Sequence, residues 1–255
     1  AFKLGLLDTV GFAADQGGRG FHLPTAITIR GDGRIFVASR SNSGALNIVG
    51  IQMVTREHGF FGQIGGYGRE PGQMVWPTAL TLDSGNNLYL ADDYLHRITV
   101  YDGEGNLVTT WGTKGSGKGE FDGPSGLAVD GDDNLIVVDH RNHRIQRFTT
   151  EGDLLDQWGS FGDGDGQFNL PWGITRDAQG YLYVADWRND RVQKLTPDGR
   201  FVAAYGSSGD GDGQFNRPSS VAVDSDGNIF ITDWGNQRVQ VLDRDGVQQP
   251  FLEGA

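Results

Sequence analysis

The stretch "VDHRNHRIQRF", residues 137–147, contains an aspartate that is followed five residues later by an arginine. Whether this spacing recurs elsewhere in the chain decides the fold. The histidines and arginines of this stretch are the residue types of a metal site or an anion pocket. However, "LADDYLHRITVY" (90–101), "VADWRNDRVQKL" (184–195) and "ITDWGNQRVQVL" (231–242) keep the same internal spacing. A pair that recurs at a fixed interval indicates architecture, so each pair is predicted to pin a β-hairpin by a charge-assisted hydrogen bond. The pairs stand 47 residues apart, at Asp92 and Arg97, Asp139 and Arg144, Asp186 and Arg191, and Asp233 and Arg238.

Other residues keep the same interval, and a fixed period of this length is the signature of a repeat fold. Within one unit, the runs 125–130, 134–139, 144–148 and 153–159 are rich in strand-forming residues, and Gly, Asp and Asn lie between them. Four antiparallel strands per unit are therefore expected. Such sheets bury their faces against one another, which predicts an all-β fold, a β-propeller. The further markers are a proline that opens each first strand (Pro77, Pro124, Pro171, Pro218), an aspartate (Asp83, Asp130, Asp177, Asp224) and an aromatic residue before glycine (Trp111, Trp158, Tyr205).

The chain is predicted to be a single propeller domain over 1–255, with units at about 12–65, 66–112, 113–159, 160–206 and 207–255. Residues 1–11 are interpreted as the outer strand of a closing blade, because "LLDTVG" (6–11) aligns with "LLDQWG" (154–159). The fifth unit already has an outer strand of its own in "DGVQQPFLEGA" (245–255), so the N-terminal strand has no partner within this chain. This favours a six-bladed propeller with one blade missing from the segment; a five-bladed ring with an additional strand is the alternative.

The first unit departs from the pattern. Six extra residues fall within "RSNSGALNIVG" (40–50), Ser39 stands at the aspartate position, and no arginine stands at the position that begins the third strand in the other units. We expect this blade to lack the aspartate–arginine pair.

Composition excludes several classes of function. A net charge of −12 and a pI near 4.7 argue against nucleic-acid binding, which depends on clustered Lys and Arg. The absence of cysteine excludes disulfides, thiolate zinc sites and cysteine nucleophiles. No apolar run is long enough to span a membrane. The chain begins at Ala1, so the expectation is a soluble protein that is either cytoplasmic or secreted with its signal peptide removed.

The stretch "SSVAVDSDGNIFITDWGNQRVQVLD" (219–243) resembles the NHL repeat, and the resemblance covers roughly residues 20–250. It implies a β-propeller that binds a protein or a small-molecule ligand. Within this class, the repeat sequence is most similar to that of the peptidyl-α-hydroxyglycine amidating lyases, which implies zinc-binding histidines close to the strand-opening proline. Thr, Ser and Trp stand at those places here, so the histidine positions of the lyases are not retained.

Function is expected where equivalent positions of the repeat differ. In propellers of this type two loops of each blade emerge around the mouth of the central channel, where Trp and Arg are typical of recognition surfaces. The alternative is that the indoles plug the channel and the arginines are solvated. The predicted ligand-binding residues follow the strand-opening proline (Thr25, Thr78, Ser125, Trp172, Ser219) or the strand-ending acid (Arg40, Asp93, His140, Trp187, Trp234), with Tyr94 and Arg188 next in their loops.

A lyase or hydrolase that acts on a small molecule or peptide at the channel mouth is the alternative function. In it, His140 would be a general base, and Arg40 or Arg141 would hold an anionic substrate. No G-x-S-x-G motif supports a serine nucleophile. An RNA-binding face is a further alternative, formed from Arg40, Arg141, Arg188 and Arg217.

No metal or cofactor is predicted. The sequence "GDGDGQF" (162–168 and 209–215) alternates aspartate with glycine, but it lacks the acidic residue that closes an EF-hand loop. We therefore interpret it as a turn; a zinc or calcium site is the alternative.

Overall fold

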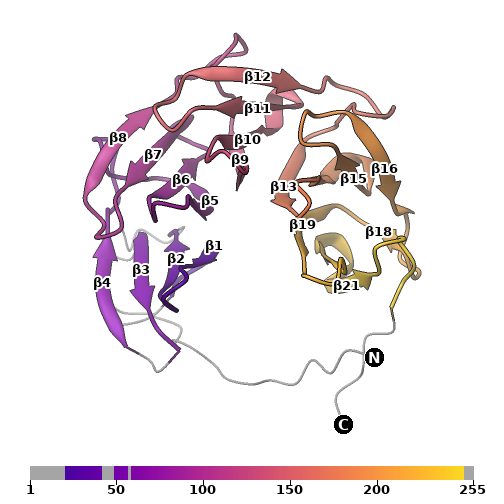
Figure 1. Ribbon diagram of the computed structural model, residues 1–255, viewed down its shortest axis with the longest axis horizontal. Helices are drawn as coiled ribbons and strands as arrows, with labels where there is room; N and C mark the ends of the chain where they lie inside the picture. The colour runs from indigo at the N-terminus through magenta and orange to yellow at the C-terminus, as the bar shows by residue number, and fades with distance from the viewer. Residues whose placement is uncertain (1–20, 42–48, 57–58, 250–255) are drawn as a thin grey trace. The chain divides into compact units, whose positions relative to one another are not determined.

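A computed structural model describes residues 21–41, 49–56 and 59–249 (Figure 1). The fold is all-β, and its sheets are the antiparallel blades of a β-propeller, as the repeat predicts. The chain divides into two compact units, one up to Ser125 and one from Gly126. Among the described residues, no helix has the length and apolar character needed to cross a membrane.

The unit up to Ser125 holds two blades, each with four strands that pair in sequence order. Blade 1 consists of β1 (Pro24–Ile29), β2 (Ile35–Ser39), β3 (Gly50–Val54) and β4 (Phe60–Ile64). Blade 2 consists of β5 (Pro77–Leu82), β6 (Leu88–Asp92), β7 (Arg97–Tyr101) and β8 (Leu107–Trp111).

The unit from Gly126 holds the other three blades, although the first strand of blade 3 already begins at Pro124. Blade 3 consists of β9 (Pro124–Val129), β10 (Leu135–Asp139), β11 (Arg144–Phe148) and β12 (Leu154–Trp158). Blade 4 consists of β13 (Pro171–Arg176), β14 (Leu182–Asp186), β15 (Arg191–Leu195) and β16 (Phe201–Tyr205). Blade 5 has β19 (Pro218–Val223), β20 (Ile229–Asp233) and β21 (Arg238–Leu242), and a short parallel pair, β17 (Ser207–Ser208) and β18 (Gln214–Phe215), precedes it.

The predicted outer strand of blade 5 begins to pair within the described residues. Leu242 bridges Gln248, and the amide of Gln249 donates to the carbonyl of Val241 at 2.8 Å. The remainder of that strand, at 250–255, lies outside the described residues, as do the predicted N-terminal strand at 6–11 and most of the insertion in blade 1. The number of blades in the closed propeller therefore stays a prediction.

The phenylalanine of each repeated "GQF" or "GEF" sequence is a buried residue that we call a plug. Phe121, Phe168 and Phe215 are fully buried. Gly159 lies against the ring of Phe168 with a φ of +93°, and a Cβ atom there would fall 2.7 Å from the ring. A side chain at this position would therefore collide with the plug as well as strain the backbone.

The first strands of blades 2, 4 and 5 each pack an aliphatic residue onto the preceding blade. Ile174 of β13, for example, lies in one buried cluster with Ile136 and Val138 of β10. The equivalent residues Leu80, Leu127 and Val221 are also buried, and the four are only 5–8% exposed. Ile27 occupies the same position in β1 and differs from these four residues, because its side chain is 63% exposed.

Candidate functional site

Two kinds of loop lie together at one edge of each sheet. The hairpin loop joins the second and third strands, and the inter-blade loop leads into the first strand. They are neighbours because the strand-opening proline pairs with the strand-ending acid, as Pro171 does with Asp186. In blade 4 the amide of Arg188 donates to the carbonyl of Asn169 at 3.0 Å, which ties the two loops together.

The hairpin loops of blades 3, 4 and 5 are single turns of 3-10 helix, each closed by a residue in the left-handed conformation. These turns are η2 (His140–Asn142), η3 (Trp187–Asn189) and η4 (Trp234–Asn236).

The strand-ending aspartate is the hub of this edge. Asp186 is 0% exposed, and its carboxylate accepts hydrogen bonds from the amide of Asn169 at 2.8 Å and from Nε of Arg191 at 2.9 Å. The side chains of Asn189 and Gln193 donate to it as well. Asp139 with Arg144, and Asp233 with Arg238, form the same pair at 2.8 Å. The predicted hairpin pin is therefore confirmed in three blades.

Blade 2 contradicts this prediction. Arg97 donates to the carbonyls of Arg69, Glu70 and Gln73 at 2.8–2.9 Å instead of pairing with Asp92. The buried Asp92 carboxylate accepts from four backbone amides, those of Val75, Trp76, Tyr94 and Leu95. The physical reason is local sequence: Leu95 and Thr99 replace the Asn and Gln that complete the hub elsewhere.

The two arrangements differ in their electrostatics. Burial raises the pKa of the Asp92 carboxyl above its ordinary value, and the four amides offset only part of that effect. Burial also acts to raise the pKa of Asp233, but hydrogen bonds from the Asn216 amide and from the Asn236, Arg238 and Gln240 side chains together lower it below its ordinary value. A charged carboxylate is thus better supported where the full hub is present.

In blades 2, 3 and 4, the side chain of the residue that closes the hairpin loop accepts a hydrogen bond from the loop that leads to the next strand-opening proline, a contact that we call the clip. Nδ1 of His96 accepts from the amide of Gly123 at 3.2 Å, and Nδ1 of His143 accepts from the amide of Leu170 at 3.0 Å. An Asp190 carboxylate oxygen accepts from the amide of Arg217 at 2.7 Å in the same way. Because Nδ1 accepts only in the neutral ring, His143 must be uncharged here, and burial followed by the nearby His140 lowers its pKa. Both histidines of the opening stretch are therefore built into the scaffold, since His140 is also buried.

In the unit up to Ser125, most predicted site residues are buried or form hydrogen bonds with the backbone. The Thr25 hydroxyl donates to the carbonyl of Ala38, and the Thr78 hydroxyl donates to the carbonyl of Pro124. Asp93 and Ser125 are buried. Tyr94 is exposed, and its hydroxyl accepts a hydrogen bond from Arg69 at 2.8 Å. Arg40 is half-buried, and its guanidinium stacks on Trp76 at 4.3 Å from the ring centroid.

In the unit from Gly126, three of the predicted ligand-binding residues and Arg217 supply aromatic and basic side chains on neighbouring loops. The Cζ atoms of Arg188 and Arg217 each lie 5.1 Å from the ring centroid of Trp187. Trp234 is 59% exposed, and its loop is tied to that of Arg217 because the amide of Gly235 donates to the carbonyl of Asn216. We call Trp187, Arg188, Arg217 and Trp234 the loop surface.

Four further predicted residues of this unit, namely His140, Arg141, Trp172 and Ser219, are not part of the loop surface. His140 is 5% exposed and meets the ring of Trp172 edge-on at 4.8 Å, so its imidazole is packed beneath the surface. Ser219 is half-buried, and Arg141 is exposed.

Sequence reasoning missed Trp76 and did not place Arg217 among the ligand-binding residues. Each stands directly before a strand-opening proline, at Pro77 and Pro218. The signal was available, because this position varies between repeats as the predicted ones do.

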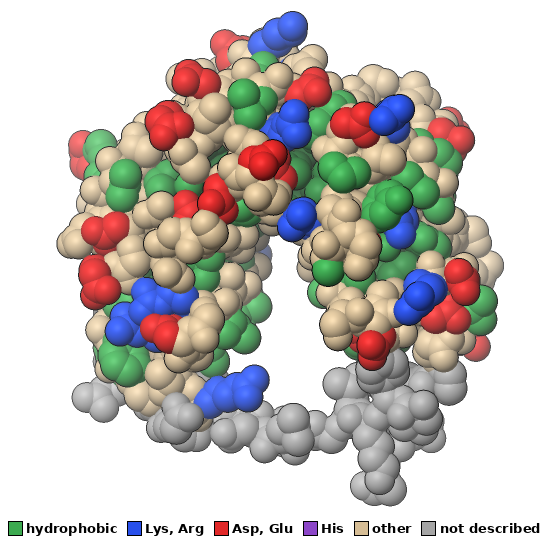
Figure 2. All heavy atoms as spheres, viewed as in Figure 1, with side chains coloured by type: hydrophobic (Ala, Val, Ile, Leu, Met, Phe, Trp, Pro, Cys, Tyr) green, Lys and Arg blue, Asp and Glu red, His purple; other side chains and the backbone are tan. Residues whose placement is uncertain are grey.

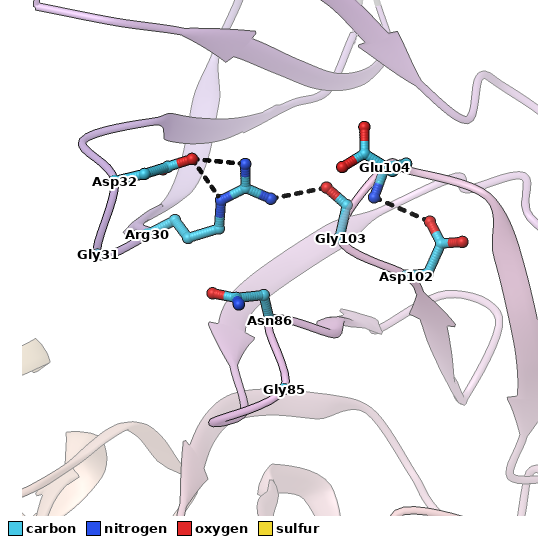
Figure 3. A pocket seen from close by; sticks show the side chains of 8 residues that line it. All are labelled: Arg30, Gly31, Asp32, Gly85, Asn86, Asp102, Gly103 and Glu104. Atoms are coloured by element: carbon cyan, nitrogen blue, oxygen red, sulfur yellow. Dashed lines mark hydrogen bonds and ion pairs between the residues drawn. The ribbon is translucent and has the colours of Figure 1, made fainter.

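A pocket at the opposite ends of the strands is lined by turns of blades 1 and 2 (Figure 3). Arg30 donates to Asp32 at 2.7 Å and to the carbonyl of Gly103 at 2.7 Å, so its guanidinium joins the two blades. The bond from Arg30, together with that from the Arg34 amide, lowers the pKa of Asp32 to about 2. Arg30 and Asp32 therefore satisfy one another, and Arg30 links turns of the two blades.

The "GDGDGQF" stretch folds as a turn whose backbone oxygens are used by the hub. The carbonyls of Gly162, Gly164 and Gln167 accept hydrogen bonds from the side chains of Asn189 and Arg191. Within the described ranges, no three or more His, Asp and Glu side chains cluster as metal ligands would. Acidic and basic side chains are interspersed over the face drawn in Figure 2.

Comparison with known families and structures agrees with this architecture. The NHL repeat model matches residues 121–148, 168–195 and 215–242. Virginiamycin B lyase from Staphylococcus aureus shares the fold with a TM-score of 0.63 and 13% identity, over 89% of this chain and 69% of that chain. A streptogramin B lyase gives 0.61 and 14%, over 92% and 84%, and a chain of a nidogen/laminin complex gives 0.65 and 19%, over 90% and 79%. A search of curated protein sequences finds no match.

Proposed function

Because the chain is an NHL-repeat β-propeller, we propose that it is a binding protein that takes a protein or small-molecule ligand at the loop surface. One observation carries the proposal: Trp187, two arginines and Trp234 are gathered on hydrogen-bonded loops of adjacent blades. Trp and Arg supply large contact areas and oriented hydrogen bonds, and they dominate the binding energy of most interfaces.

The test compares two pairs of exposed side chains. Trp187→Ala with Trp234→Ala removes the aromatic part of the loop surface, whereas Leu155→Ala with Val202→Ala removes exposed apolar groups from the outer strands β12 and β16. A library of small molecules and short peptides is screened against both by saturation-transfer NMR, and circular dichroism verifies that each variant is folded. Ligands of the wild type that the control retains and the tryptophan variant loses support the proposal. Ligands that the tryptophan variant retains contradict it.

A lyase or hydrolase is the second candidate, favoured by the fold shared with the two lyases, although 13% and 14% identity carries no catalytic residue across. His140, its suggested base, is buried against Trp172, and Arg40 belongs to the other compact unit. Elemental analysis of the purified protein tests the metal-dependent form of this alternative. Stoichiometric zinc or calcium would favour the enzyme over the binding protein.

A further inference from the structure

Among the described residues, Arg188 and Arg217 differ from most arginines in that their guanidiniums have no polar partner. Arg144, Arg191 and Arg238 donate to buried aspartates, and Arg30 and Arg97 donate to carbonyl oxygens. Within the described part of the chain, the guanidiniums of Arg188 and Arg217 have no hydrogen bond or ion pair, and both stack on Trp187. Their donors therefore face solvent.

The backbone fixes both arginines in place. The amide of Arg188 is bound to the carbonyl of Asn169, and the amide of Arg217 is bound to Asp190. Arg217 adopts a φ of +58°, a left-handed conformation that is uncommon for residues other than glycine. A cation whose backbone is held in this way loses less conformational freedom when it binds an anion.

The chemistry of the pair selects the ligand. A guanidinium offers a planar fork of donors that matches a carboxylate, and the indole face of Trp187 supports a flat or apolar group beside it. The net charge of −12 repels a polyanion such as a nucleic acid far more strongly than a ligand with one negative charge. We propose that the loop surface binds small organic carboxylates, with Arg188 and Arg217 holding the carboxylate and Trp187 the adjoining apolar group. This inference rests on the proposed binding function.

The test uses N-acetylphenylalanine and its amide, which differ only in the negative charge. Binding to the whole chain is followed by NMR titration at low ionic strength. We expect the acid to bind with a dissociation constant in the millimolar range and the amide to bind at least about tenfold more weakly, the equivalent of one charge-assisted hydrogen bond. Added salt should weaken the binding of the acid and leave the binding of the amide unchanged.

Three variants complete the design. Arg188→Gln and Arg217→Gln keep most of the side chain that covers the indole but remove the charge. Each substitution should weaken the binding of N-acetylphenylalanine about tenfold. Arg200→Gln is the matched control, because Arg200 is an exposed arginine of the same unit that is paired with Asp198. It should leave the affinity unchanged.

The outcomes separate this inference from the proposed function. If acid and amide bind equally and Trp187→Ala abolishes both, the loop surface binds ligands but has no preference for anions, and the inference is wrong. The inference is also wrong if the acid does not bind at all. It is equally wrong if the two glutamine variants bind the acid with the same affinity as the wild type. The ligand screen against the tryptophan variants decides the proposed function separately.

Discussion

Two aspartate–arginine pairs with the same sequence spacing should differ sharply in their coupling energies. Asp186 and Arg191 are joined by a 2.9 Å hydrogen bond around a fully buried carboxylate. Asp92 and Arg97 have no such bond, because Asp92 accepts from backbone amides and Arg97 donates to carbonyls. Double-mutant cycles with alanine at both positions isolate the pairwise term in each blade.

The expected magnitudes follow from these contacts. A charge-assisted hydrogen bond contributes about 1.5–3 kcal/mol, and removal of one partner of a buried pair costs about 3–5 kcal/mol. We therefore expect Asp186→Ala to lower the free energy of unfolding by about 3–5 kcal/mol and the cycle with Arg191→Ala to return about 2 kcal/mol of coupling. For Asp92 and Arg97 the coupling should be smaller by at least about 1 kcal/mol, because no hydrogen bond is lost between them.

Urea denaturation followed by tryptophan fluorescence supplies the free energies, with unchanged m-values as the condition for comparing them. Asp198→Ala is the control, since its pair with Arg200 is exposed and should contribute no more than about 1 kcal/mol. Equal coupling in the two blades would refute the assignment of different partners to Arg97 and Arg191. An Asp186→Ala loss no larger than that of Asp198→Ala would refute the hub itself.

Three further predictions concern packing and protonation. The buried Thr99 hydroxyl has no hydrogen-bond partner among the described residues, so Thr99→Val should raise the free energy of unfolding by about 1 kcal/mol in urea denaturation, and a loss would reveal a partner. The lowered pKa of His143 means that its stabilising contribution is present above its ordinary value of 6.5 and is lost as the pH falls through the folded value. His143→Asp, which copies the acceptor at Asp190, should make the stability less pH-dependent between about pH 5 and about pH 7, and an unchanged pH profile would remove His143 from the clip. Ile174→Ala should lower the free energy of unfolding by about 2–4 kcal/mol, and Ile27→Ala should lower it by less than about 0.5 kcal/mol, in thermal or chemical unfolding. A large loss at Ile27 would show that its side chain is buried in the folded protein.

The repeat made the strands of the fold predictable from the sequence. Four residue types at a constant interval of 47 fixed the strand ends, and the structure begins β5, β9, β13 and β19 at the four predicted prolines. The buried Phe168 and Phe215 also stand 47 residues apart, although their burial was not predicted. A periodic signal predicts the strand ends because each copy must satisfy the same packing and hydrogen-bonding constraints.

The partners of individual side chains were less predictable. The spacing of Asp92 and Arg97 equals that of Asp186 and Arg191, yet the hub also needs the Asn and Gln that stand at residues 189 and 193 and are absent at 95 and 99. The spacing of aspartate and arginine alone was therefore not sufficient to predict that the two side chains pair. His140 was placed at a mouth because of its position in the repeat, but the neighbouring Trp172 buries it, and this contact depends on one copy alone.

The loop surface shows how a position can be structural in one junction and available for binding in another. Arg40 with Trp76, and Trp187 with Arg217, occupy the same two positions of the repeat with the residue types exchanged, at 4.3 and 5.1 Å. A cation on an indole at a blade junction is therefore a recurring packing contact of this chain. What sets the second junction apart is Arg188, which brings to the same indole another guanidinium that has no polar partner in the part of the chain that the structure describes. The residue after Arg40 is Ser41. The excess of positive charge over what packing requires, rather than the stacking itself, is the feature that favours recognition of an anion.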